Sequence, residues 1–370
     1  MDNSPKTSGR LLSLDTLRGF DMFWISGGEN LIHVLAKVTG WSWAVALGLQ
    51  FRHVEWHGFV AYDLIFPLFL FLAGVSAPFS IGSRLEKGTD KKELARKAIS
   101  RGLILFCLGV LYNNGLFHTA WEKMRYGSVL GRIGLAGMFA QLIYIYCSSR
   151  AQWIWFASLL IGYWLFMAYY PVPGCGAGLF TMECNPASYL DRLIMPGHLY
   201  KDIHDPEGFA STIPAISTAL LGIFAGKILR EKNRPKQQKV AIIGIAGVIS
   251  LIAAILWGTI FPINKNLWTS SFALMAGGWS LLLLALFYFV VDVLEWRKWT
   301  FFFVVIGMNS IVIYMVGDFI DFRYTTEALF GGLLSFLPEG AEKLGKIVAF
   351  LGVQWAFLYV LYRNKWFLKV

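Results

Sequence analysis

The chain is a series of long apolar segments separated by mostly short polar connections. Ten segments approach the roughly 20 residues that an α-helix needs to cross a bilayer. They cover residues 15–29, 57–83, 101–117, 128–147, 152–170, 209–229, 239–261, 269–293, 300–320 and 346–362. The pattern predicts an all-α polytopic membrane protein, with about ten transmembrane helices in one bundle. It also predicts one integral-membrane domain over residues 11–370, preceded by a polar segment, 1–10.

Composition supports a membrane protein, and the positions of the basic residues predict its orientation. Of the 370 residues, 56% are hydrophobic and 16% aromatic, more than a soluble domain of this size carries. Alternate connections hold 21 and 10 Lys and Arg residues, so both termini are expected in the cytoplasm. The net charge of +10 is explained by this topology and by anionic lipid, and no nucleic-acid partner is expected. Three outer connections, 30–56, 171–208 and 321–345, are long enough to cover a cavity.

Proton-handling side chains gather where the second apolar segment begins. His53 and His57 flank Glu55, and Asp63 follows within the apolar run. Ionisable groups are costly at membrane depth and usually line a cavity or have a partner. No cation lies within one helical turn of Asp63, so its partner must come from another helix or from an imidazole of the preceding loop. An aspartate that orients a histidine is the usual arrangement for a general base.

Other polar residues have both structural and functional interpretations. Asp15 and Arg18 are three residues apart and are expected to pair on one helix face. Arg132 needs an anionic partner, either a bound phosphate or the carboxylate of Asp63 or Asp292. The basic connections 84–101 and 227–239 can hold a polyphosphate, or they can only anchor helix ends.

The four cysteines show no metal-ligand spacing, and no metal is expected. Cys107 and Cys147 lie in predicted helices, whereas Cys175 and Cys184 lie in the outer connection 171–208. Cys175 and Cys184 can pair in an oxidising compartment, although Cys175 can equally be a free thiol where oxidation is lacking.

Several polar motifs, far apart in the chain, resemble a known family. They include residues 10–19 (RLLSLDTLRG), 52–58 (RHVEWHG), 63–67 (DLIFP) and 307–311 (GMNSI). In this order and rough spacing they look like the transmembrane acetyltransferases typified by heparan-alpha-glucosaminide N-acetyltransferase and its bacterial relatives. The resemblance extends from residue 10 to the C-terminus.

The resemblance implies a reaction across the membrane. An acetyl group would pass from cytoplasmic acetyl-CoA to the amino group of a glucosamine-type sugar at the outer side of a bacterial inner membrane, in a homodimer. The family's catalytic histidine matches His53, not His57. A functional asparagine of the family falls near Glu29 and Asn30, and the longer chain between this point and His53 is a departure that affects acceptor specificity.

Acetyl transfer to an amine needs a base, donors for the developing oxyanion and a dry site. His53 can act as the base, or it can carry the acetyl group itself. The residues expected to contact the substrate are Glu29, Asn30, His57, Lys265, Asn266 and Asn309. The cations expected to hold coenzyme A are Arg84, Arg101, Arg132, Lys227 and Arg230. As structural alternatives, Asn309 can bond helix to helix and the loop residues can simply be solvated.

Two other functions remain open at this stage. One is an acyltransferase with a different carbohydrate acceptor. The other is a proton-coupled transporter that uses His53 and Asp63 as a relay. Such a transporter is expected to have duplicated halves, which this sequence does not show.

Overall fold

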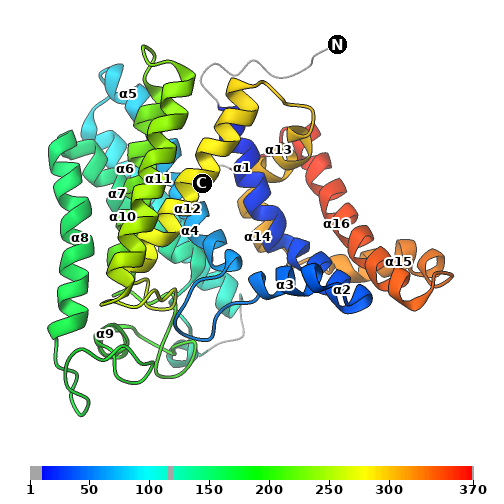
Figure 1. Ribbon diagram of the computed structural model, residues 1–370, viewed down its shortest axis with the longest axis horizontal. Helices are drawn as coiled ribbons and strands as arrows, with labels where there is room; N and C mark the ends of the chain where they lie inside the picture. The colour runs from blue at the N-terminus through cyan, green and yellow to red at the C-terminus, as the bar shows by residue number, and fades with distance from the viewer. Residues whose placement is uncertain (1–10, 116–119, 318, 369–370) are drawn as a thin grey trace.

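The computed structural model describes residues 11–115, 120–317 and 319–368, which form helices joined by irregular connections (Figure 1). Within these residues the only extended pairing is an isolated bridge between Val172 and Gly176. The predicted all-α fold is confirmed. The polar segment 1–10 lies outside the described residues.

Seven helices among the described residues are long and apolar enough to cross a membrane. They are α4 (Ile65–Ala77, extended by its flanking turns to Ala61–Glu86), α7 (Val129–Tyr146), α8 (Ser149–Tyr169), α10 (Thr212–Arg230), α11 (Lys236–Gly258), α12 (Ser270–Tyr288, extended to Val293) and α16 (Glu339–Arg363). Each coincides with one of the ten apolar segments of the sequence.

The other three expected spans form helices that are shorter, more charged or interrupted. They are α1 (Leu12–Phe23), α6 (Lys91–Asn114) and the pair α13 (Thr300–Met308) and α14 (Ser310–Val316). The first half of α6 is strongly basic, and α13 and α14 are separated by a break at Asn309. The count of ten spans therefore remains a prediction.

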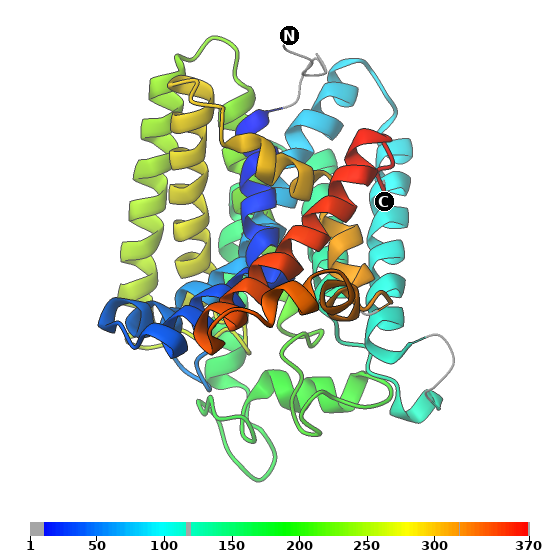
Figure 2. The same cartoon turned by 90° about the vertical axis from the view of Figure 1, so that its right-hand side faces the viewer.

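Short helices collect at one end of the bundle. They are α2 (Glu29–Thr39), α3 (Ser42–Gln50), α9 (Pro186–Ile194) and α15 (Phe322–Leu334). The start of α1, the short α5 (Ser83–Glu86) and the end of α16 lie at the opposite end (Figures 1 and 2). The connections 30–56, 171–208 and 321–345, expected as long loops, therefore contain helices. We call the end that carries α2, α3, α9 and α15 the α9 end.

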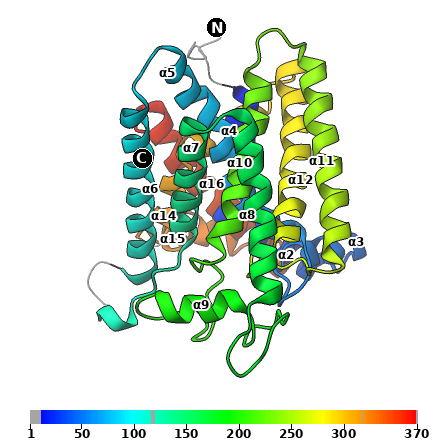
Figure 3. The same cartoon turned by 90° about the vertical axis from the view of Figure 1, so that its left-hand side faces the viewer.

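The bundle is built around α10. In its most apolar window 83% of α10 is buried, against 22% for α11 and 11% for α16. Exposed apolar side chains on these two helices include Ile249 and Leu256 on α11 and Val348 on α16. Figure 3 shows α11 at the edge of the bundle, with α10 further inside. Helices α4 and α10 are in backbone contact, because a Cβ at Gly74 would lie 2.1 Å from the carbonyl oxygen of Ala219. Close packing of small residues is how membrane helices associate, and it fixes α4 rigidly in the bundle.

Candidate active site

Asp63 and His53 form a bonded pair at the α9 end. Asp63 belongs to the 3-10 turn that precedes α4, and its Oδ2 accepts a hydrogen bond from the backbone N–H of Val60 at 3.2 Å. Its Oδ1 lies 2.7 Å from Nδ1 of His53. A carboxylate only accepts, so Nδ1 carries the hydrogen and Nε2 is left with a free lone pair. The side chain of Asp63 is fully buried, whereas that of His53 is 49% exposed.

Lys265 completes this cluster from a distant part of the chain. Its Nζ lies 3.4 Å from Oδ1 of Asp63, and 3.1 Å and 3.2 Å from Nδ1 and Nε2 of His53. The ring of Tyr62 also packs beside the imidazole, with ring centroids 4.7 Å apart. Burial lowers the pKa of Lys265, and the nearby Asp63 carboxylate partly opposes this effect. We call Asp63, His53 and Lys265 the His53 cluster.

Backbone bonds hold together the two loops that carry the His53 cluster. Gly58, with φ +125°, donates from its N–H to the carbonyl of Ile263 at 2.8 Å. A residue with a side chain rarely adopts this φ, so glycine suits the turn. His57 contacts Asn264, with 3.2 Å between Nδ1 and Nδ2, and burial lowers the pKa of His57. His57 thus packs against the loop that carries Lys265.

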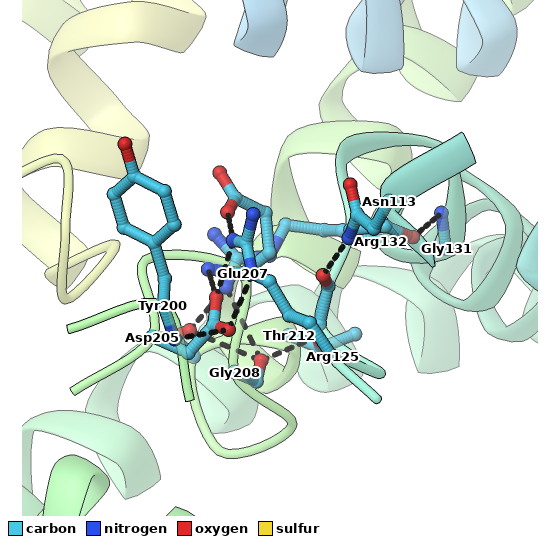
Figure 4. Close-up of polar contacts among 12 residues, drawn as sticks. Asn113, Arg125, Gly131, Arg132, Tyr200, Asp205, Glu207, Gly208 and Thr212 are labelled. Carbon is cyan, nitrogen blue, oxygen red and sulfur yellow. Dashed lines mark hydrogen bonds and ion pairs between the residues drawn. The ribbon is translucent and has the colours of Figure 1, made fainter. Parts of the chain in front are cut away.

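A second charged cluster stabilises the loops at the α9 end (Figure 4). Arg125 donates two bonds to Asp205, from Nε to Oδ2 and from Nη2 to Oδ1, each 2.8 Å long. The same guanidinium reaches Glu207 at 2.5 Å and stacks over the ring of Tyr200 at 4.5 Å. The carboxylate of Asp205 also accepts from the backbone N–H groups of Tyr200 and Glu207. We call Arg125, Asp205 and Glu207 the Arg125 cluster.

Arg132 does not pair with either of the carboxylates suggested by the sequence. Its Nη2 bonds to the carbonyl of Gly208 at 3.2 Å and to the hydroxyl of Ser211, and its guanidinium lies over the ring of Trp268 at 4.9 Å. The prediction of Asp63 or Asp292 as its partner was wrong. Gly208 and Ser211, which follow Glu207 in the chain, supply these neutral partners, and Figure 4 labels Gly208 and Arg132.

A cavity of about 560 Å³ lies between α1, α4, α6, α7 and α14. Two arginines line it, Arg18 and Arg101, and Arg18 is held by Asp15 at 3.3 Å and by Ser76 at 3.0 Å. The pairing of Asp15 with Arg18 expected from their spacing is confirmed. Asn309, at the break between α13 and α14, also lines the cavity, is 2% exposed and has no hydrogen-bond partner for either side-chain polar atom. Such a cavity can hold a ligand that carries both anionic and amide groups.

The structure separates the five cations expected to hold coenzyme A. Arg101 lines the cavity, but Arg84, Arg132, Lys227 and Arg230 do not. Arg230 pairs with Glu86 and Lys227 bonds to Gln152, which are local contacts near helix ends. These contacts fit the alternative in which the basic connections anchor helix ends.

The residues expected to contact substrate lie in three places. Lys265 belongs to the His53 cluster, with His57 and Asn266 in the adjoining loops, and Asn309 lines the large cavity. Asn30 donates to Glu29 at 2.9 Å and lines a separate pocket of about 290 Å³ with Arg323 and Lys346. The structure therefore does not bring this set into one site.

Sequence reasoning missed three residues that line the large cavity or contact the two histidines. Arg18 was interpreted only as the partner of Asp15, yet it lines the large cavity. Asn264 and Tyr62 were not singled out, although they contact His57 and His53. The proximity of Tyr62 to Asp63 in sequence is the one local signal that could have found it.

The cysteines of the outer connection are paired. Cys175 and Cys184 form a disulfide that closes the loop between α8 and α9. The free-thiol alternative for Cys175 therefore does not hold in this structure. The same loop accepts a hydrogen bond from Nε1 of Trp56 at the carbonyl of Phe180, 2.7 Å away, so it is tied to the segment that carries His53.

Seven apolar helices and a buried ionisable cluster at one end of the bundle are features of an integral membrane protein with a polar site. Comparison with known proteins specifies the class further. Residues 10–257 match the family described as "Heparan-alpha-glucosaminide N-acetyltransferase, catalytic". The chain therefore belongs to the heparan-alpha-glucosaminide N-acetyltransferase family, which confirms the resemblance in the motifs.

Two full-length relatives support this assignment. The heparan-alpha-glucosaminide N-acetyltransferase of Homo sapiens is 30% identical, over 98% of this chain and 60% of the relative. The mouse protein of the same name is 28% identical, over 100% of this chain and 62% of the relative. The chain thus spans about 60% of the length of these relatives. Lys265 and Asn309 lie beyond the residues that match the family's catalytic model.

Proposed function

We propose that this protein is a transmembrane acetyltransferase that moves the acetyl group of cytoplasmic acetyl-CoA to the amino group of a glucosamine-type sugar at the outer side. The observation that carries the proposal is the His53–Asp63 pair, a half-exposed imidazole held at 2.7 Å by a buried carboxylate. Membership in a family whose named relatives are N-acetyltransferases supports the reaction class.

The large cavity fits coenzyme A by its chemistry. Arg18 and Arg101 would face the phosphates, and the unpartnered amide of Asn309 would meet an amide of the pantetheine arm. Gly137 leaves the wall open, because only Gln141, 4.0 Å away, comes near a Cβ built there. Phe69 lines the cavity and lies six residues after Asp63 along the same helical segment, an axial rise of roughly 10 Å. A pantetheine arm can span this distance toward His53.

His53 has two possible roles in the transfer. As a general base, its Nε2 accepts a proton from the sugar ammonium, and the free amine attacks the thioester carbonyl in a ternary complex. As a nucleophile, Nε2 takes the acetyl group first and passes it to the amine. In both cases Asp63 holds the ring and stabilises the charge that develops on it.

The proposed topology follows from the charge count. The end of the bundle that carries α5 and the start of α1 would face the cytoplasm, with both termini there. The α9 end would face the opposite side of a bacterial inner membrane. A disulfide at the α9 end suits an oxidising compartment. Lipid would surround α8, α11 and α16, and we expect a homodimer as in the family.

The function is tested by incubating purified protein with radiolabelled acetyl-CoA and a panel of amino sugars. We expect N-acetylated glucosamine from the wild type and from His57→Ala, and none from His53→Ala. Loss of activity in His57→Ala with retention in His53→Ala would contradict the assignment of His53.

The same panel addresses the other functions. Acetylation of a hydroxyl or of a different sugar would favour an acyltransferase with another acceptor. Uptake of label into proteoliposomes without any acetylated product would instead favour transport.

A further inference from the structure

Lys265 places a primary amine where the proposed reaction needs one. Its Nζ lies within 3.2 Å of both ring nitrogens of His53, including Nε2, the nitrogen that Asp63 leaves free. The acceptor sugar in the proposed function must bring its own ammonium to this nitrogen. The lysine therefore places its amine next to the position that the acceptor amine must take.

The backbone of the loop that carries Lys265 is ordered in a turn. Oδ1 of Asn264 accepts from the N–H of Leu267 at 2.9 Å, and the N–H of Trp268 bonds to the carbonyl of Lys265 at 3.0 Å. Trp268 is itself fully buried. The turn fixes the start of the Lys265 side chain, and the contact of Nζ with Oδ1 of Asp63 at 3.4 Å keeps the amine beside His53.

The local environment also suits an amine nucleophile. Burial favours the neutral form of the Lys265 side chain, and a neutral amine is the nucleophilic form.

We propose that Lys265 is an internal acetyl acceptor, which the protein acetylates with acetyl-CoA when no acceptor sugar is bound. This inference rests on the proposed use of acetyl-CoA at this site. In the step, Nζ attacks the acetyl carbon, His53 takes the proton from Nζ, an N–C amide bond forms and the C–S bond breaks. Coenzyme A leaves as its thiol, with the proton that His53 accepted.

Acetylation would switch the site off. It removes the charge that faces Asp63 and fills the space next to His53 with an amide that cannot be transferred further. The acceptor sugar would compete for the same space and so protect the enzyme. Acetylation of Lys265 would thus inactivate the protein when acetyl-CoA is present without an acceptor sugar.

The test is peptide mass spectrometry on the purified full chain after incubation with isotope-labelled acetyl-CoA. We expect label on Lys265 and little on Lys201, an exposed lysine in the connection between α9 and α10, as the control for uncatalysed acetylation. His53→Gln should lower the rate of labelling at Lys265 about 100-fold, the scale of general base catalysis, and leave Lys201 unchanged. Saturating glucosamine should suppress labelling of Lys265 only.

A kinetic experiment gives a second readout. Preincubation of the wild type with acetyl-CoA alone should cause a progressive loss of sugar acetylation. Lys265→Arg, normalised to its own starting rate, should show no such loss. Labelling of Lys265 no faster than that of Lys201, or unchanged in His53→Gln, would overturn the inference.

The outcomes also separate this inference from the proposed function. Acetylated sugar without labelled Lys265 would overturn the inference alone. Labelled Lys265 that depends on His53, without acetylated sugar, would support the inference and overturn the proposed acceptor. If neither product forms, both proposals fail.

Discussion

The Arg125 cluster and the His53 cluster both join a fully buried aspartate to cations at the α9 end, yet their bonding differs. Arg125 binds Asp205 through two parallel bonds of 2.8 Å, and the carboxylate receives further backbone N–H groups. Asp63 instead bonds a half-exposed imidazole, and Lys265 contacts both of these residues. A planar, bidentate pair fixes two loops in place, whereas an imidazole with one free nitrogen can exchange a proton. The comparison distinguishes a supporting cluster from a reactive one.

Among the variants that test this comparison, we expect Asp63→Asn to have the largest effect on activity. The amide can turn its NH₂ toward Nδ1 and favour the tautomer with hydrogen on Nε2, which removes the base. We expect kcat for sugar acetylation to fall by about 10² to 10⁴-fold, with little change in KM for the sugar. Steady-state kinetics on folded, monodisperse protein would measure this. A fall in thermal stability as large as that of Asp205→Asn would instead make Asp63 a supporting residue.

The same substitution in the Arg125 cluster should act on stability. Asp205→Asn leaves the guanidinium of Arg125, whose side chain is 19% exposed, without its bidentate partner, and we expect a loss of about 1 to 3 kcal/mol. We expect a lower unfolding temperature in detergent, with kcat of the remaining folded protein changed less than in Asp63→Asn. Arg125→Lys keeps the charge but not the bidentate geometry, so its loss of stability should be intermediate. Unaltered unfolding in Asp205→Asn would contradict the supporting role.

A smaller effect concerns acid stability of the loops beside the Arg125 cluster. Burial lowers the pKa of His204 from 6.5 to about 4, and its Nδ1 bonds to Ser188. Burial raises the pKa of Asp191 from 3.8 to about 6. As pH falls from 6 to 4, His204 becomes protonated in the unfolded state but stays neutral in the folded state. The free energy of unfolding therefore decreases. Over the same range the folded state takes up a proton at Asp191 that the unfolded state still lacks, so stability is gained.

These two contributions should nearly cancel in the wild type between pH 6 and pH 4. Relative to the wild type, His204→Gln should gain stability as pH falls and Asp191→Asn should lose it. Each difference is expected to be at most about 1.4 kcal/mol per pH unit. Thermal unfolding at pH 4, 5, 6 and 7 would measure both slopes. Two variants that follow the wild-type curve would show that neither group titrates as its burial implies.

The fold was largely predictable, because hydrophobic patterning acts along the chain. The seven helices long enough to span a membrane coincide with apolar segments, and the contact between His53 and Asp63 joins residues only ten positions apart. The short helices α2, α3 and α15 were missed, because a search for apolar segments long enough to cross a membrane assigns every connection between them to a loop.

The site was less predictable, because its members meet through tertiary folding. Lys265 lies 212 residues from His53, and no local pattern reports their contact. The partner of Arg132 was predicted from charge alone, but carbonyl, hydroxyl and aromatic groups solvate that cation. The cations of short connections mostly bond to neighbours at helix ends, so their density did not indicate which of them line the cavity.

The hydrogen bond between the N–H of Gly58 and the carbonyl of Ile263 has an evolutionary consequence. It joins the two loops through main-chain atoms, so this bond does not depend on the side chains at positions 265 and 266. Substitutions at these two positions can therefore remodel what is recognised next to His53 while the side chain of Asn264 keeps its contacts with Leu267 and His57. Such an arrangement lets relatives diverge in acceptor without rebuilding the scaffold, and grafting this short loop between them should exchange their preferences.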